Sequence, residues 1–114
     1  LKKIKLKING TGEEVRSFIH IDDFVDGFAS IFSKGKHMEI YNIGTQNKIK
    51  ISDLAKLIGG KLNKKIIIEG KCNYSGGTNI RCPNISKIRK LGFKEKILLK
   101  DGLDNIIKKM KIDY

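Results

Sequence analysis

The sequence predicts a mixed α/β fold: a single domain over residues 1–114 that combines a small sheet with three to four helices. Alternating side chains over residues 3–8 and 15–21 are typical of strands. Apolar residues at helical spacing then recur over residues 23–33 and 99–111. A chain of 114 residues and 12.9 kDa has room for one small core, which fits these elements.

The first two strands are expected to form a hairpin over residues 3–21, joined at the glycine-containing turn 9–12. The second strand presents two faces. Val15, Ile19 and Ile21 share one face, and Arg16, Phe18 and His20 share the other. The chain opens in the middle of a Lys/Ile alternation, so we expect it to be cut from a longer protein.

A helix is predicted over about residues 23–33, with Asp22 or Asp23 as its N-cap and Gly35 at its end. Its apolar side is expected to face the core. The residues on that side are Phe24, Val25, Phe28, Ile31 and Phe32. A third strand is predicted over residues 39–43.

In the second half, Ser52 is expected to cap a helix that Gly59 and Gly60 either end or fray. A short apolar strand follows over residues 65–69, and a polar loop over residues 70–79.

A brief strand over residues 80–82 precedes a helix that begins at Asn84 and ends at Gly92. The last helix covers about residues 99–111.

Arg16 is the side chain best suited to bind an anionic ligand. A guanidinium group on a strand is a planar, permanently charged donor for phosphate or carboxylate. The alternative is a surface arginine paired with Glu13 or Glu14, an arrangement that contributes little to stability. His20 shares the predicted face, but a single histidine with no partner is more often structural.

Several segments, in this order, carry a family resemblance. They are Gly10–Gly12, Arg16–Asp23, Tyr41–Gly44, Ile51–Ala55, Asn84–Phe93 and Leu99–Leu103. Together they resemble the C-terminal part of extended short-chain dehydrogenases, and more narrowly the NAD-dependent nucleotide-sugar epimerases and dehydratases. The resemblance implies a C-terminal substrate-binding lobe whose Rossmann half lies outside the chain.

The resemblance also implies a ligand, a nucleoside-diphosphate sugar, with Arg16 at the diphosphate and Phe18 beside the nucleotide. Core packing is the alternative role for Phe18. Many family members carry a second phosphate-binding arginine in an R-x-G-D motif, where this sequence reads Tyr74-Ser75-Gly76-Gly77. Tyr74 enters the expected substrate site by this correspondence. Either Arg81 supplies the second charge or the chain holds its ligand differently.

Catalysis in this family requires a glycine-rich turn that binds NAD and a Tyr-x-x-x-Lys pair. This sequence has no such pair, and Gly10-Thr11-Gly12 lacks the third glycine and leads into a strand. We therefore predict no catalytic or cofactor-binding residue in the chain, with NAD bound by the other half of a parent enzyme that is a homodimer. Cys72 and Cys82 have no neighbouring cysteine or histidine to complete a metal site.

The formal net charge of +12 suggests a second hypothesis, a free-standing basic module that binds RNA or DNA. However, only three of the 24 basic residues are arginines, and the lysines are spread over every segment. We therefore favour a solvated lysine surface, with no nucleic-acid partner. No apolar run approaches the roughly 20 residues of a membrane span, so no membrane association is expected. Reduced cysteines fit a cytoplasmic protein.

Overall fold

The structure is a computed structural model that describes residues 2–69 and 77–112. Within these ranges it contains four strands and four helices. In chain order they are β1 (Lys2–Lys7), β2 (Val15–Ser17), α1 (Ile21–Lys34), β3 (Lys48–Lys50), α2 (Ile51–Lys61), β4 (Lys64–Glu69), α3 (Ser86–Arg89) and α4 (Leu99–Ile112). The predicted mixed α/β class is confirmed, although the strands form two separate pairs.

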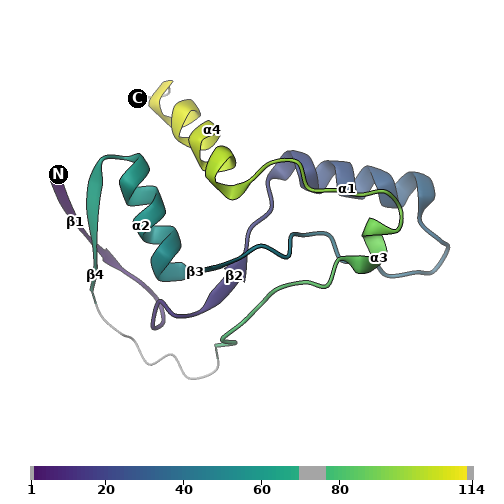
Figure 1. Ribbon diagram of the computed structural model, residues 1–114, viewed down its shortest axis with the longest axis horizontal. Coiled ribbons are helices and arrows are strands. Elements are labelled where there is room, and N and C mark those ends of the chain that lie inside the picture. Colours follow the sequence, from purple (N-terminus) through teal and green to yellow (C-terminus); the bar gives the residue numbers. More distant parts are fainter. Residues whose placement is uncertain (1, 70–76, 113–114) are drawn as a thin grey trace.

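The strand pairing differs from the predicted hairpin. β1 pairs with β4 in parallel, whereas β2 pairs with β3 in an antiparallel ladder. The turn between β1 and β2 explains the difference, because Gly10 (φ +118°) and Gly12 (φ +83°) adopt backbone conformations that favour glycine. This turn directs the chain into the second sheet (Figure 1).

The strand predicted over residues 15–21 is shorter in the structure, and the N-cap predicted for the helix that follows it is wrong. β2 ends at Ser17, and α1 begins at Ile21 with His20 as its N-cap. The Nδ1 atom of His20 accepts a hydrogen bond from the backbone N–H of Asp22 at 3.1 Å. A ring nitrogen thus fills the role expected of Asp22 or Asp23.

The strand predicted over residues 39–43 is wrong. Met38 has a φ of +61°, and the segment that follows has no strand pairing within the described residues. Side-chain hydrogen bonds hold this segment in place instead. The Tyr41 hydroxyl accepts a hydrogen bond from the backbone N–H of Lys36 at 3.0 Å, and Asn42 Nδ2 donates one to Asn84 O at 3.3 Å. An alternating pattern forms a strand only where another strand lies beside it.

The predicted boundaries of α2 are also wrong at both ends. Lys50 is the N-cap, with no side-chain hydrogen bond, and the backbone N–H of Ser52 donates to Gly12 O at 2.9 Å. The helix continues through Gly59 and Gly60 to Lys61. β4 follows almost at once and begins at Lys64, one residue earlier than expected.

The C-terminal elements agree more closely with the prediction. α3 is shorter than predicted, since it spans Ser86–Arg89 and its N-cap is Ile85 and not Asn84. Asn84 Oδ1 still accepts a hydrogen bond from the backbone N–H of Ser86, and Gly92, which follows the helix, has a φ of +90°. α4 spans nearly the predicted range. The strand predicted over residues 80–82 reduces to a single parallel bridge between Ile80 and Val15.

The hydrophobic core is small and lies between α1 and α3. Ile85, Ile88 and Phe93 are its buried members, and they pack with half-buried neighbours. These neighbours are Ile19, Ile31, Tyr41, Ile43 and Leu91. Figure 1 places α1 and α3 at one end of the molecule, and β1, β4 and α2 at the other.

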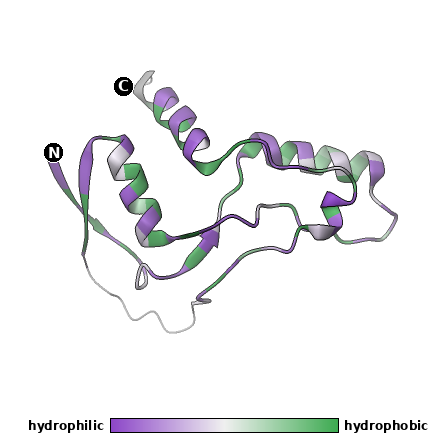
Figure 2. Cartoon of the chain, in the orientation of Figure 1, coloured by the Kyte–Doolittle hydropathy of each residue, from purple (hydrophilic) through white to green (hydrophobic). Residues whose placement is uncertain are grey.

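Most of the apolar side of α1 does not face this core, contrary to prediction; of its predicted members, Ile31 alone packs against the core. Phe24, Phe28 and Phe32 are 41%, 61% and 88% exposed. The buried residues of the helix are Asp23 and Gly27. Figure 2 shows hydrophobic segments along α1, while hydrophilic stretches occur in every long helix.

Candidate functional site

Arg16 lies in β2 and is half-buried. Its Nη1 atom donates to Val15 O at 2.8 Å and contacts Asn79 O at 3.5 Å. Glu14 binds the preceding turn instead, and Glu13 forms an ion pair with Lys50 at 2.7 Å. The surface pairing considered as the alternative role of Arg16 is therefore not formed among the described residues.

Arg81 lies beside Arg16 on the neighbouring segment of chain. The backbone N–H of Val15 donates to Asn79 O at 2.7 Å, and that of Arg81 donates to Val15 O at 3.0 Å. Because Val15 and Ile80 form a parallel bridge, Arg16 and Arg81 follow it in the same register. Arg81 is exposed, and its Nη2 atom approaches Thr78 Oγ1 at 3.4 Å.

Within the described ranges neither of these guanidinium groups has an ion pair, although the chain contains 12 acidic residues. Arg89, the third arginine, does have one, with Glu95 at 3.2 Å. Two arginines in register on bridged segments, with no ion pair among the described residues, attract anions, and their donors fit phosphate oxygens.

Phe18 follows β2 and is 40% exposed, so it is not a core residue. It lines two neighbouring cavities. The smaller, of about 190 Å³, also has walls from Thr45, Asn47 and Glu95. Ile49, which pairs with Arg16 in the β2–β3 ladder, contributes to the same wall.

The larger cavity, of about 310 Å³, is almost entirely apolar. It lies between α2 and α4, with Leu54 and Ile58 on one side and Leu103 and Ile106 on the other. Lys61 Nζ and Asp104 Oδ1, 2.5 Å apart, link the same two helices. The hydrogen bond from Lys61 lowers the pKa of the Asp104 carboxyl below its ordinary value.

His20 also lines the larger cavity, but the cap bond to Asp22 occupies its Nδ1 atom. A β-carbon on Gly102 of α4 would lie 3.0 Å from the His20 ring, so the ring packs closely on that helix. These contacts support the structural role predicted for His20. Tyr74, the remaining predicted substrate-binding residue, lies outside the described residues.

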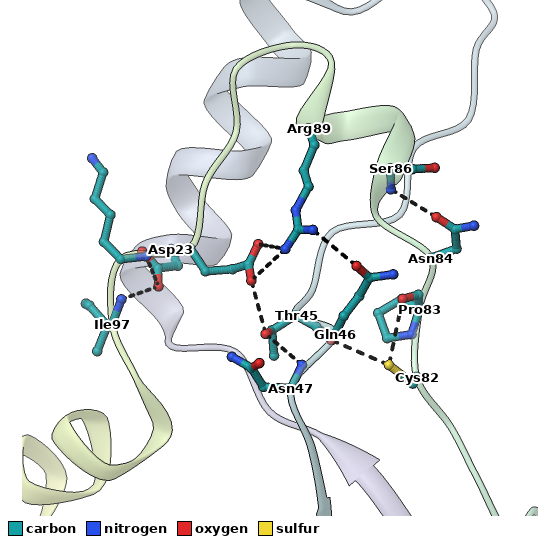
Figure 3. Close-up of polar contacts among 12 residues, drawn as sticks. Asp23, Thr45, Gln46, Asn47, Cys82, Pro83, Asn84, Ser86, Arg89 and Ile97 are labelled. Atoms are coloured by element: carbon teal, nitrogen blue, oxygen red, sulfur yellow. Dashed lines mark hydrogen bonds and ion pairs between the residues drawn. The ribbon is translucent and has the colours of Figure 1, made fainter.

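Long-range polar contacts that the sequence analysis missed hold the loops around the smaller cavity (Figure 3). Glu95 accepts hydrogen bonds from Thr45 Oγ1 and Arg89 Nη2, each at 3.2 Å. Arg89 Nη1 also donates to Gln46 Oε1. Thr45 and Glu95 are 50 positions apart, so no local pattern signals this contact.

A second missed contact fixes the wall shared by both cavities. Asp23 is 1% exposed, and its Oδ2 atom accepts the backbone N–H groups of Lys96 and Ile97 at 3.0 and 2.9 Å. Figure 3 shows Asp23 beside Ile97. Ile97 lines both cavities. The carboxylate at the start of α1 thus positions the segment that faces Phe18.

The glycine turn before β2, formed by Gly10 and Gly12, does not fit a dinucleotide. The backbone N–H groups of Thr11 and Gly12 donate to the Glu14 carboxylate at 2.8 and 2.9 Å. These bonds, chiefly that from Thr11, hold the pKa of Glu14 below its ordinary value. A carboxylate occupies the amides that would bind pyrophosphate, and the turn leads to a strand and not to a helix N-terminus.

Residues 2–69 and 77–112 offer no metal site and no membrane-spanning helix. No group of three or more acidic, histidine or cysteine residues there is arranged to hold a metal ion. Likewise, none of the helices in these ranges combines the length and apolar character needed to cross a bilayer.

Comparison with known proteins places this fold in a family. Residues 1–44 match the model of the NAD dependent epimerase/dehydratase family. GDP-L-fucose synthase 1 of Arabidopsis thaliana is 33% identical over an alignment of 99 residues, and the match covers 82% of this chain and 29% of that protein. The dTDP-D-glucose 4,6-dehydratase of Bos taurus is 34% identical over 110 residues, 90% of this chain and 31% of the relative.

A solved structure of an epimerase has the same fold over nearly the whole chain. UDP-glucuronic acid 4-epimerase from Bacillus cereus, in complex with UDP-4-deoxy-4-fluoro-glucuronic acid and NAD, superposes with a TM-score of 0.84 at 26% identity. The match covers 96% of this chain and 36% of the epimerase chain. The chain thus spans about a third of the proteins it resembles. In sequence and in fold it belongs to the NAD-dependent epimerase/dehydratase family, of whose structure it forms one part.

Proposed function

We propose that this chain is the C-terminal substrate-binding domain of an NAD-dependent nucleotide-sugar epimerase or dehydratase. Its ligand is a nucleoside-diphosphate sugar, and Arg16 and Arg81, which lie in register on bridged segments, neutralise the diphosphate. The observation that supports this most is the position of these arginines, side by side on bridged segments and without an ion pair among the described residues.

Phe18 extends this site toward the sugar or the base. It is partly exposed, and Thr45, Asn47 and Glu95 surround the cavity beside it with groups that can bind hydroxyls. Tyr74 belongs to the same site by its place in the sequence. Fixing the diphosphate sets the position of the sugar relative to the cofactor.

The parent enzyme supplies the remaining parts. NAD is held by the portion outside this chain, since the glycine turn here is occupied by Glu14. Relatives act on GDP-, dTDP- and UDP-linked sugars according to their names, which supports a role in glycan or surface polysaccharide synthesis. We further propose a cytoplasmic homodimer that binds neither nucleic acid nor membrane.

Calorimetric titration of the 114-residue chain with UDP, GDP and dTDP tests the site. We expect at least one of them to bind, and Arg16→Ala to weaken that binding by about 10- to 100-fold, since a charge-assisted hydrogen bond contributes about 1.5–3 kcal/mol. Lys56→Ala on the exposed surface of α2 is the matched control, because it also removes one positive charge.

Equal losses in Arg16→Ala and Lys56→Ala would reject a specific site and indicate a diffuse charge effect. Tight binding to an arbitrary oligonucleotide, falling steeply as salt is raised, would instead favour the basic nucleic-acid module.

A further inference from the structure

One asparagine of the chain is followed directly by a glycine, and this pair lies in the turn between β1 and β2. The pair is Asn9-Gly10, whereas every other asparagine precedes a lysine, an isoleucine or a tyrosine. A side chain on the following residue hinders the approach of that residue's backbone nitrogen to the asparagine amide, and a glycine removes this hindrance. Asn9 is therefore the asparagine best placed to react with its own backbone.

The fold leaves this pair free to react. Asn9 is exposed, and neither its side-chain amide nor the Gly10 N–H has a hydrogen-bond partner among the described residues. Gly10 has a φ of +118°, and a β-carbon there would lie 2.5 Å from Glu14 Oε1, so the Glu14 carboxylate rests against the glycine. An attack from Gly10 on Asn9 is intramolecular and has no hydrogen bond of the pair to break.

Two aspartates that precede a glycine have the opposite arrangement. Asp26-Gly27 lies within α1, and Asp101-Gly102 lies within α4. An aspartate can close the same ring by losing water, but the N–H of a helical glycine is held by the carbonyl four residues before it. The N–H of Gly102 donates in this way to Leu98 O at 2.9 Å. Helical backbone thus protects these two pairs, and the turn does not protect Asn9.

We propose that Asn9 is a site of spontaneous deamidation in the folded chain, with water as the only co-reactant. The Gly10 nitrogen bonds to Asn9 Cγ, the Cγ–Nδ2 bond breaks, and ammonia leaves with the Gly10 amide proton. Water then opens the resulting succinimide ring. Opening at Cγ leaves aspartate, whereas opening at the main-chain carbonyl carbon of residue 9 leaves isoaspartate, whose main chain is longer. Either product adds a negative charge at neutral pH.

The modified turn also supports the start of α2. This helix has no side-chain cap, and the turn supplies acceptors for its first N–H groups. The N–H of Ile51 donates to Glu14 O at 3.0 Å, and that of Ser52 donates to Gly12 O at 2.9 Å. A longer main chain at position 9 displaces these carbonyls, so isoaspartate should loosen the first turn of α2.

Peptide mapping by mass spectrometry, after timed incubation of the 114-residue chain at neutral pH, follows each asparagine separately. We expect Asn9 to convert faster than Asn63 by on the order of tenfold or more, because Lys64 hinders the attack at position 63. Asn63 is the matched control, since it is also exposed and has a φ of +53°. Both aspartate and isoaspartate should appear at position 9, while Asp101 keeps its normal linkage.

Asn9→Gln should remove the acidic form that ion exchange separates, and Asn63→Gln should leave that form in place. Hydrogen exchange of the separated isoaspartyl form should be faster at Ile51 and Ser52 than in the fresh chain.

Equal conversion at positions 9 and 63 would overturn the proposal. So would conversion at position 9 that occurs only after the chain is unfolded in urea, because the native turn would then protect the pair. Unchanged exchange at Ile51 and Ser52 would reject the link between this turn and α2. No nucleotide is added, so these results are independent of the UDP titration.

Discussion

At the residue scale, Asp23 has the most consequential position in the described structure. Its carboxylate is buried at the start of α1 and accepts two backbone N–H groups from a segment more than 70 positions away. A buried donor that loses its acceptor costs about 1–3 kcal/mol, whereas a typical bond between satisfied groups contributes about 1 kcal/mol. Removing the Asp23 side chain should therefore cost more stability through the N–H groups left without an acceptor than the two hydrogen bonds contribute on their own.

Asp23→Ala should therefore lower the free energy of unfolding by about 2–4 kcal/mol, since the N–H groups of two part-buried hydrogen bonds lose their acceptor. Asp23→Asn keeps an amide oxygen that can accept, and should cost clearly less. The measurement is urea denaturation at pH 7. Asp26→Ala is the control, because Asp26 is exposed and pairs with Lys96 at 3.7 Å, so its loss should be below about 1 kcal/mol. Equal losses at positions 23 and 26 would contradict this account.

At the element scale, sequence periodicity locates α1, α4 and β4 within a few residues. These elements carry their signal locally, in apolar spacing and in glycine near their ends. Strand pairing could not be read in the same way: β1 finds its partner 62 residues further along, at Lys64, and no local pattern encodes that choice. The polar contacts of Asp23 and Glu95 are missing from the sequence analysis for the same reason.

The glycine pair in α2 shows why a local rule fails there. Gly59 and Gly60 were expected to end the helix, yet the helix continues to Lys61. A β-carbon on Gly59 would lie 2.9 Å from Lys64 O and closer still to Ile66 Cγ1, whereas one on Gly60 would meet nothing within 4 Å. The close approach of β4 thus requires a glycine at position 59, whereas no contact in the structure requires one at position 60.

The two adjacent substitutions should consequently have opposite effects. Gly60→Ala should raise the free energy of unfolding by about 0.5–1 kcal/mol through helix propensity. Gly59→Ala gains the same propensity but must displace β4, so we expect a net loss of about 1–3 kcal/mol. Thermal denaturation of both variants checks this. If Gly59→Ala proves as stable as Gly60→Ala, then β4 can move away from α2 to accept a β-carbon at position 59 without loss of stability.

At the scale of the whole molecule, the chain is open, and ion pairs supplement a small core. Lys61 with Asp104 links α2 to α4 across the larger cavity, and Lys87 with Glu39 links α3 to the loop after α1. Lys87 also lies 4.9 Å from the ring centre of Tyr41. The hydrogen bonds from these lysines lower the pKa of Asp104 and of Glu39, as the bond from Thr11 lowers that of Glu14.

These three shifts predict the direction of acid destabilisation. A carboxyl whose pKa is lower in the folded chain than in the unfolded chain binds fewer protons when folded. Its contribution to stability is therefore complete above the unfolded pKa, which is about 4, and is lost as the pH falls through the folded pKa. We expect the urea midpoint to change little between about pH 7 and 5 and to fall steadily below about pH 4.

Asp104→Asn removes the ion pair between Lys61 of α2 and Asp104 of α4, and so isolates its share of the pH dependence. The variant should be less stable than the unmodified chain at pH 7, and the difference should shrink as the pH falls below about 4 and the native carboxyl becomes protonated. Hydrogen exchange should show the loosening first in α4, because Lys61 and Asp104 bridge the cavity that separates it from α2. A constant difference between the two proteins from pH 7 to pH 3 would mean that the ion pair does not couple α4 to the fold, and that apolar contacts alone hold it.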